Sequence, residues 1–204
     1  EGGIGWKYIT KPLECLNIVY PNTKIDTYIK KYKNEPDFLE FDNFPMVSIN
    51  DIIGQKGLSS CMHFSKQLSS FKYKSNKEHV FSLEHLPKYS CKIHKIVQCI
   101  LNSKGVVLVY SQYIQGGCIP IALALESVGI TRYKNKSLFE NPPTESIDVN
   151  TMKPNEHNSD FKPARYTFVT GNHNLSKDSS RDIDAATNER NVNGENIKVI
   201  IISD

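Results

Sequence analysis

The stretch Gly105–Val128, GVVLVYSQYIQGGCIPIALALESV, decides the fold class of this chain. Val106–Tyr110 is an unbroken apolar, β-rich run, typical of a strand buried on both faces of a parallel sheet. A polar turn and two glycines follow, and Pro120 then suits the first turn of a helix. Four apolar residues continue at helical spacing on one face, namely Ile121, Ala124, Leu125 and Val128. The order of strand, polar turn, glycines and helix predicts half of a βαβ unit.

Apolar runs on both sides of this stretch predict the other elements. Before it, we expect a strand, two helices and a third helix capped by Ser90, over Leu13–Tyr20, Thr23–Lys33, Ser48 or Asn50 to Met62, and Tyr89–Ser103. After it, we expect strands over Ile130–Tyr133, Arg165–Val169 and Val199–Ile202, with a helix from Ser179 or Ser180 to Asn191. This order predicts an α/β fold with a parallel sheet covered by helices.

The pattern also predicts how the chain is divided. Residues 1–87 are expected to form an irregular, mixed connector, and residues 88–204 the sheet domain. Within that domain, residues 134–163 are rich in Pro, Asn, Ser and Glu and predict a polar insertion. The chain starts without methionine and ends directly after an apolar strand, so we expect it to be part of something longer.

Bulk composition sets limits on the class of protein. The net charge is +3, but residues 1–104 carry 15 Lys and 10 acids (+5), whereas residues 105–204 carry 10 Lys and Arg and 12 acids (−2). This asymmetry permits contact with phosphates. Five cysteines without a CxxC pair indicate a reducing compartment. With neither a signal peptide nor a membrane-length apolar run, the sequence predicts an intracellular protein without a membrane partner.

Two polar turns are the candidate binding sites. Ser111, Gln112 and Tyr113, with Gly116 and Gly117, follow one expected strand, and Thr170, Gly171 and Asn172 follow another. Open α/β sheets bind ligands at the carboxyl ends of their strands. The alternative is that the two glycines simply join a strand to a helix. The lysine-rich stretch Lys66–Glu78 carries interleaved aromatics that can hold a nucleic-acid strand, although an amphipathic hairpin or a solvated loop explains it as well.

Other chemistry finds little support in the sequence. The segment Gly54–Ser60 has the wrong spacing for a phosphate-binding P-loop, and no GxGxxG motif opens a helix. Cys118 has no partner histidine, and no histidine has metal-ligand spacing. We therefore predict no catalytic residue and no metal site in this chain.

A family resemblance adds to this interpretation. Lys88–Tyr113 resembles the start of the second RecA-like motor domain of superfamily 2 helicases and translocases, in which a strand ends in a phrase like Tyr110-Ser111-Gln112. More narrowly, YSQYI-x-GG-x-x-P-x-ALALE-x-x-G-x-x-RY over Tyr110–Tyr133 resembles helicases of giant nucleocytoplasmic DNA viruses. Shorter matches follow in the same order at Leu16–Pro21, Ile53–Leu58, Tyr166–Gly171 and Ala185–Ser203.

The resemblance implies a RecA-like sheet, here incomplete, and a role for the two polar turns. Ser111, Gln112 and Tyr113 correspond to motif IV, and Thr170, Gly171 and Asn172 to the turn after the next core strand. Together with Gly116 and Gly117 they are expected to track a nucleic-acid backbone. Ser203 would open motif V. The rest of motif V, the arginine of motif VI and the first motor domain are absent, and Gln115 replaces an expected acid.

The implied function is therefore part of an ATP-dependent helicase or translocase, with ATP and Mg²⁺ held by the full-length parent and not by this chain alone. The implied partners are DNA or RNA, the first RecA-like domain of the parent and viral transcription machinery, in the virion or the host cytoplasm. Two alternatives stay open at this point. One is a virion or transcription-complex scaffold with a helicase fold, and the other is a doubly wound small-molecule enzyme.

Overall fold

The structure is a computed structural model that describes residues 9–34, 44–67, 69–75, 79–142, 144–154, 160–173, 175, 176 and 178–203. Its centre is a four-stranded parallel sheet in the order β3-β6-β5-β4, formed by Val107–Tyr110, Val199–Ile202, Arg165–Val169 and Thr131–Arg132. The α/β class and the parallel sheet predicted from the sequence are confirmed. Each strand lies within the run that predicted it.

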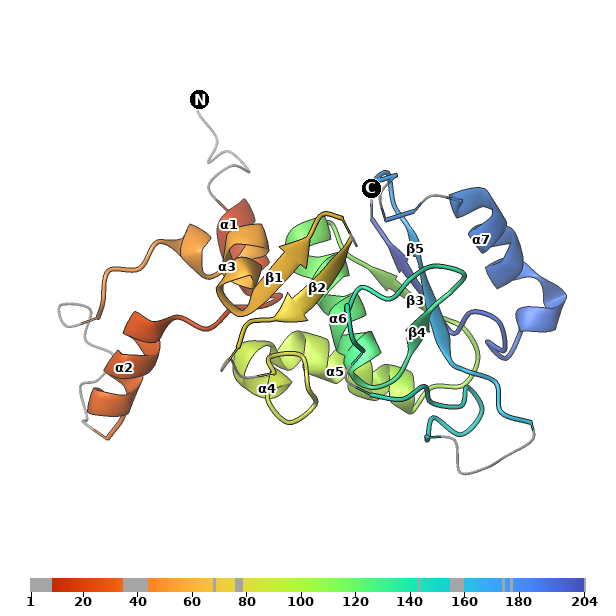
Figure 1. Cartoon of the computed structure of the whole chain (residues 1–204), viewed down its shortest axis with the longest axis horizontal. Helices are drawn as coiled ribbons and strands as arrows, with labels where there is room; N and C mark the ends of the chain where they lie inside the picture. The colour runs from red at the N-terminus through yellow and green to blue at the C-terminus, as the bar shows by residue number, and fades with distance from the viewer. Residues whose placement is uncertain are drawn as a thin grey trace.

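Helices lie on both sides of the sheet (Figure 1). α5 (Cys91–Leu101) and α6 (Ile119–Ser127) pack together between the sheet and the N-terminal elements, and α7 (Ser179–Thr187) contacts β5 on the outer side. Ser90 caps α5 as predicted, because its Oγ accepts a hydrogen bond of 2.9 Å from the Ile93 amide. α7 is followed by a short 3₁₀ helix at Glu189–Asn191.

The central strand differs from its prediction in one respect. β3 has an end position in the described sheet, and Leu108 and Tyr110 are 62% and 56% exposed. Alternate side chains of a strand point to opposite faces, and here only the face with Val109 joins the core. The prediction that this strand is buried on both faces is therefore wrong.

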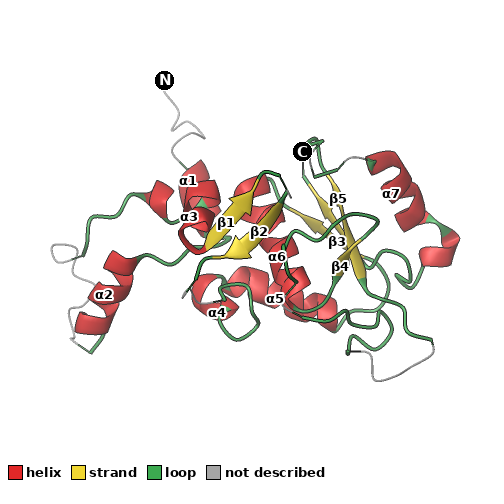
Figure 2. Cartoon of the chain, viewed as in Figure 1, coloured by secondary structure: helices red, strands yellow, loops and turns green. Residues whose placement is uncertain are grey.

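α6 is more deeply buried than its apolar stripe predicted. Every residue from Ile119 to Glu126 is buried, and the helix is preceded by one turn of π-helix at Ile114–Cys118, which contains both glycines. α6 contacts α5 and β4, and the hydrophobic cluster to which it belongs also contains Met62 and Phe71 of the hairpin described below, which explains its burial (Figure 2).

The N-terminal part is mixed, as predicted, but its first strand is not formed. Thr10–Cys15 is the helix α1, and the following segment makes only single backbone bonds, from Val19 to the Tyr89 carbonyl and from Tyr20 to the Ile52 carbonyl. Ile18 and Tyr20 are buried, so their alternation came from packing and not from a sheet. The strand predicted over Leu13–Tyr20 is therefore wrong.

The other N-terminal elements are short. α2 (Thr23–Tyr32) agrees with its prediction, whereas the helix expected up to Met62 is split into a 3₁₀ turn (Ile49–Asp51) and α3 (Gly54–Cys61). The break falls at Gly54, whose φ of +55° is a left-handed conformation that favours glycine. β1 (Met62–Ser65) and β2 (Ser70–Tyr73) then form an antiparallel hairpin, and α4 (Leu86–Tyr89) precedes α5.

One hydrophobic cluster joins the two predicted segments. It contains Tyr20, Leu58 and Phe81 from the N-terminal part, together with Leu123 and Phe168 from the sheet part. The boundary at residue 87 stays a prediction. The polar insertion begins at Lys134 and forms isolated β-bridges, with Phe139 beside Phe71 of β2. The hairpin is thereby attached to the sheet domain through this insertion.

Candidate nucleic-acid interface

Three neighbouring strands end at the same edge of the sheet. The Ser111 amide donates a hydrogen bond of 3.0 Å to the Ile202 carbonyl, and the Ser203 amide donates one of 3.2 Å to the Val169 carbonyl. Ser111, Ser203 and Thr170 therefore follow β3, β6 and β5 side by side. The two polar turns and the serine expected to open motif V lie along the carboxyl edge, where ligands bind in open parallel sheets.

The turn after β3 is held by its own polar groups. The Ser111 hydroxyl lies 3.1 Å from the Tyr113 carbonyl oxygen and 3.2 Å from the Tyr113 amide nitrogen, and the Tyr113 phenol donates a hydrogen bond of 3.0 Å to the Thr10 carbonyl. Gln112 is exposed. A hollow of about 280 Å³ lies between this turn, α1 and α5. Of the three predicted side chains, Gln112 is thus the one most open to solvent.

Gly116 and Gly117 are buried below the turn. A Cβ atom at Gly117 would lie 1.9 Å from the Ser111 Oγ, and one at Gly116 would lie 2.1 Å from the Glu14 Oε1. Burial raises the pKa of this Glu14 carboxyl, although Lys11 acts in the opposite direction. The Ser111 contact gives Gly117 a packing explanation, whereas the atoms close to Gly116 all belong to the flexible Glu14 side chain. Contact of both glycines with nucleic acid stays a prediction.

The turn after β5 is more open. Thr170 is buried and its Oγ1 accepts a hydrogen bond of 3.2 Å from the Asn172 amide, while the Asn172 carbonyl accepts bonds from the amides of Leu175 and Ser176. Gly171 is exposed, and a Cβ atom there would meet no heavy atom within 4 Å. This turn can therefore approach a ligand closely with its backbone.

A cleft of about 740 Å³ opens beside this edge. Asn172 and Gln115 lie on its sheet side, and α3, the hairpin and the start of the insertion form its other walls. Among the residues that the structure describes, no carboxylate lines this cleft. The charged residues that line it are all cations, namely Lys66, Arg132, Lys134 and Lys136. Gln115 occupies the place where the resemblance led us to expect an acid, so the cleft gains no negative charge there.

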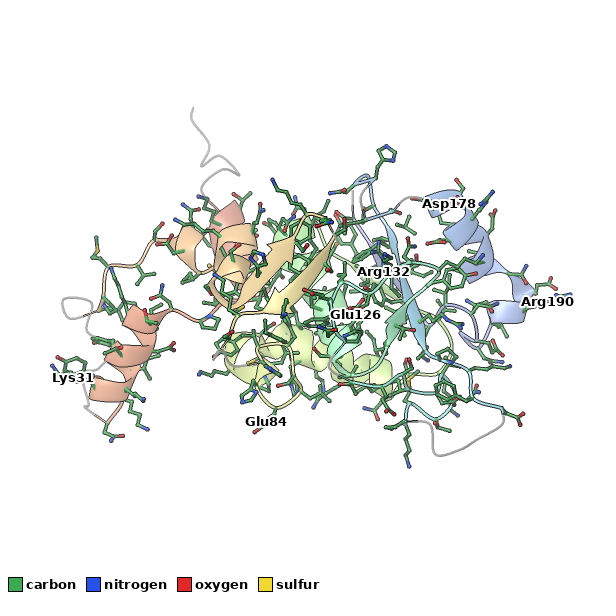
Figure 3. All side chains as sticks on the ribbon, in the orientation of Figure 1. Lys31, Glu84, Glu126, Arg132, Asp178 and Arg190 are labelled. Atoms are coloured by element: carbon green, nitrogen blue, oxygen red, sulfur yellow. The ribbon has the colours of Figure 1, made fainter. Side chains whose placement is uncertain are left out.

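The walls of the cleft are fixed by a buried carboxylate. Glu126 of α6 accepts hydrogen bonds from the amides of Leu138 and Phe139 at 2.8 and 2.9 Å, from the Ser137 hydroxyl, and from the Tyr166 phenol at 2.7 Å. The Phe71 amide of β2 donates a bond of 2.6 Å to the Leu138 carbonyl. Figure 3 labels Glu126 and Arg132 in the middle of the molecule, where the hairpin meets the sheet. The segment that bears Lys134 and Lys136 is therefore anchored to α6 through Glu126 and to the hairpin through Phe71.

Arg132 itself is held in place. Its guanidinium donates a hydrogen bond to the Leu175 carbonyl and lies 5.3 Å from the centre of the Phe168 ring. Sequence reasoning identified Lys66 through the basic, aromatic stretch, but it missed Arg132, Lys134 and Lys136. The signal that could have found them is a cation at every second position of Arg132–Lys136, starting at the last residue of a strand.

Cys118 does not have the properties of a nucleophile. Burial raises the pKa of its thiol to about 11, and the Sγ lies 3.7 Å from the Ser111 carbonyl oxygen and 3.9 Å from that of Ile202. At neutral pH the group is therefore a protonated thiol, and the reactive species of cysteine is the thiolate.

The residues tested as a phosphate loop do not fit ATP and Mg²⁺. Gly54 to Gly57 form the first turn of α3, and the Lys56 ammonium lies 2.5 Å from the Asp51 carboxylate. Over the described ranges, no group of three His, Cys, Asp or Glu side chains is placed to hold a metal ion.

No family model matches the chain, and no curated protein matches it. The helices in the described part of the chain are all too short or too polar to cross a membrane.

Proposed function

We propose that this chain is the nucleic-acid-gripping part of an ATP-dependent helicase or translocase, from the early half of its second RecA-like domain. One observation carries the proposal: two polar turns share the carboxyl edge of a parallel sheet, beside a cleft in which every charged lining residue that the structure describes is a cation. At this edge the Gln112 side chain and the Gly171 backbone are exposed, and side-chain amides and backbone groups of this kind contact the phosphates of a strand. The sequence resemblance to helicases of giant nucleocytoplasmic DNA viruses supports the same function.

In this proposal the chain grips and does not catalyse. Gln112 and the Gly171 backbone contact the strand, Thr170 and Ser111 hold the two turns in shape, and Ser203 begins the next gripping turn. ATP and Mg²⁺ belong to the full-length parent, together with the first RecA-like domain. The isolated chain should therefore show no ATPase activity, with or without nucleic acid, and measurable turnover would contradict the proposal.

Gly171 provides a sharp test of strand binding. Because the space around it is open, Gly171→Asn and Gly171→Asp add side chains of nearly the same shape that differ by one charge. Binding of a fluorescein-labelled single-stranded DNA or RNA 12-mer is followed by fluorescence anisotropy. We expect Gly171→Asp to weaken binding about fivefold or more relative to Gly171→Asn, because a carboxylate close to a phosphate costs about 1 kcal/mol even in water. Equal affinities of the two variants would argue against contact at this turn.

A further inference from the structure

We propose that the cleft between the hairpin and the sheet edge holds a short stretch of single-stranded nucleic acid, with one base stacked on Phe64 and the phosphates on Lys134 and Lys136. This inference rests on the proposed function for the class of ligand. It assigns the contacts to residues outside the two polar turns, from the β1–β2 hairpin and the start of the insertion. The two proposals can therefore be tested with separate variants.

Charge favours a phosphate ligand. Lys66, Arg132, Lys134 and Lys136 approach one cleft without a lining carboxylate among the described residues. Lys134 and Lys136 are exposed lining residues, and the Lys134 ammonium lies 5.0 Å from the centre of the neighbouring Tyr133 ring. Arg132 is held by the Leu175 carbonyl and the Phe168 ring and supplies a fixed positive charge in the lining of the cleft. An anion in this cleft would meet attraction on several sides.

The hairpin adds an aromatic surface. Phe64 and Phe71 form a cross-strand pair with ring centres 4.9 Å apart, and Phe71 is buried while Phe64 remains 44% exposed. Phe64 is thus supported from behind and available in front, and it lines the same cleft as the lysines. An aromatic ring beside cations is the arrangement with which proteins stack bases and bind phosphates of single strands. Duplex bases are already stacked on one another, so a single strand fits this surface better.

Backbone conformation points to the same cleft. Three described non-glycine residues have a positive φ, and two of them line the cleft: Ser69 at +52° and Lys134 at +48°. Such conformations cost about 1–3 kcal/mol and gather at ligand-binding sites. At Lys134 the conformation is retained next to the anchored segment of Leu138 and Phe139, whose amides are bonded to Glu126. The structure therefore maintains an unfavourable backbone conformation at one of the lysines that line the cleft.

The cleft volume of about 740 Å³ lies within the range of about 300–1,000 Å³ of small-ligand sites. It can hold only a short part of a strand. Free mononucleotides have the same chemistry as one link of a strand, so the experiment includes both.

The test uses the same 12-mer anisotropy measurement on the whole chain. A plot of log affinity against log salt has a negative slope. Lys134→Gln/Lys136→Gln should reduce the magnitude of this slope by about 1.4, since each phosphate contact on a single strand contributes about 0.7. The matched control is Lys30→Gln/Lys31→Gln on α2, which removes the same charge at the far end of the molecule (Figure 3) and should leave the slope unchanged. Equal slopes for the two double variants would overturn the proposal.

Phe64 tests the stacking contact. Phe64→Ala should weaken binding about 5- to 150-fold, the loss typical of one base–aromatic stack. Phe64→Trp should retain affinity, and its added fluorescence should be quenched by the 12-mer, which shows that the site is intact even if the alanine variant folds poorly. Normal affinity of a folded Phe64→Ala variant, or an unquenched tryptophan, would overturn the proposal.

Three outcomes separate this inference from the proposed function. Binding that depends on Gly171 but not on the cleft residues would overturn the cleft and leave the proposed function in place. Quenching of Phe64→Trp by AMP, without any affinity for the 12-mer, would overturn both. Equal competition by an acidic polyglutamate peptide would show that the cleft selects only charge and would overturn the single-strand assignment, while the Gly171 test would still stand.

Discussion

The phenol of Tyr113 donates a hydrogen bond of 3.0 Å to the carbonyl of Thr10, a residue that precedes it by 103 positions. This contact closes the turn after β3 against the helix α1. Glu14 of the same helix lies over Gly116, so α1 and the π-helical turn fit together at two points. The polar turn at the sheet edge is thus shaped partly by a segment from the beginning of the chain.

Tyr113→Phe tests the role of this contact. We expect the free energy of unfolding to fall by about 1 kcal/mol, since one hydrogen bond between uncharged groups is lost. Strand affinity should change by less than about twofold, because the phenol is already bonded to Thr10 and Gln112 is the exposed side chain of the turn. Urea denaturation and 12-mer anisotropy measure the two quantities. A large loss of affinity with unchanged stability would mean that the phenol contacts the strand.

Ser111 and Gly117 should be energetically coupled. A methyl group at Gly117 would collide with the Ser111 Oγ at 1.9 Å and meet its Cβ at 3.0 Å, so Gly117→Ala should destabilise the protein by about 1–3 kcal/mol. Ser111→Gly removes both atoms, and in that background Gly117→Ala should cost much less. A double-mutant cycle of urea denaturation measures the coupling. Additive effects would show that the backbone relaxes in some other way.

Gly171→Ala is the matched control for this cycle. The space around Gly171 is open, so the added methyl group should change the free energy of unfolding by less than about 0.5 kcal/mol. A cost at Gly171 as large as that at Gly117 would point to a general requirement for glycine flexibility and not to the predicted collision.

The sheet could be predicted from sequence because each of its strands is a local apolar run. Val199–Ile202 and Arg165–Val169 fall at the predicted residues, and the order of helices between them indicated parallel pairing. The strand predicted over Leu13–Tyr20 is not formed. The prediction failed because Ile18 and Tyr20, which are buried against the core, alternate with more exposed residues as in a strand. The exposure of Leu108 depends on the position of β3 within the sheet, and local pattern does not encode that position.

The candidate site also has one part that local sequence could predict and one part that it could not. The turns at Ser111 and Thr170 could be predicted because a strand end is visible in the sequence. The cleft depends on contacts between distant segments, such as the bond from Phe71 to Leu138 and the anchoring of Phe139 by Glu126. No local pattern brings Lys66 and Lys134 to one cleft. The aromatic, basic hairpin was visible, but its neighbours were not.

Asp148 should make stability depend on pH in the acid range. Burial acts to raise the pKa of its carboxyl, but the amides of Lys162, Thr151 and Asn150 donate to it and lower the pKa overall. A depressed pKa in the folded state contributes stability above the unfolded value of about 3.9, and this stability is lost as the pH falls through the folded value. Asp148→Asn should therefore destabilise the protein at pH 7, by about 1–3 kcal/mol.

The difference in stability between Asp148→Asn and the unmutated chain should shrink below about pH 4, where the Asp148 carboxylate of the unmutated chain also becomes neutral. Urea midpoints between pH 7 and pH 2.5 measure this change. Asp184 is exposed, so Asp184→Asn is the control and should leave the urea midpoint at pH 7 almost unchanged. Parallel curves for Asp148→Asn and the parent at all pH values would show that the three amide bonds do not depend on the charge.

Replacement of Tyr20 and of Tyr166 by phenylalanine should change the free energy of unfolding in opposite directions. Both side chains are fully buried, and burial raises the pKa of both phenols. The Tyr166 hydroxyl donates a hydrogen bond of 2.7 Å to Glu126, whereas the Tyr20 hydroxyl has no hydrogen-bond partner among the described residues. A buried polar group without a partner costs about 1–3 kcal/mol, while a bonded one stabilises the fold.

Tyr20→Phe should therefore raise the free energy of unfolding by about 1 kcal/mol, and Tyr166→Phe should lower it by about 1–3 kcal/mol. Urea denaturation of the two variants, each compared with the parent chain, measures the signs. Destabilisation by both changes would mean that the Tyr20 hydroxyl has a partner, such as a buried water molecule.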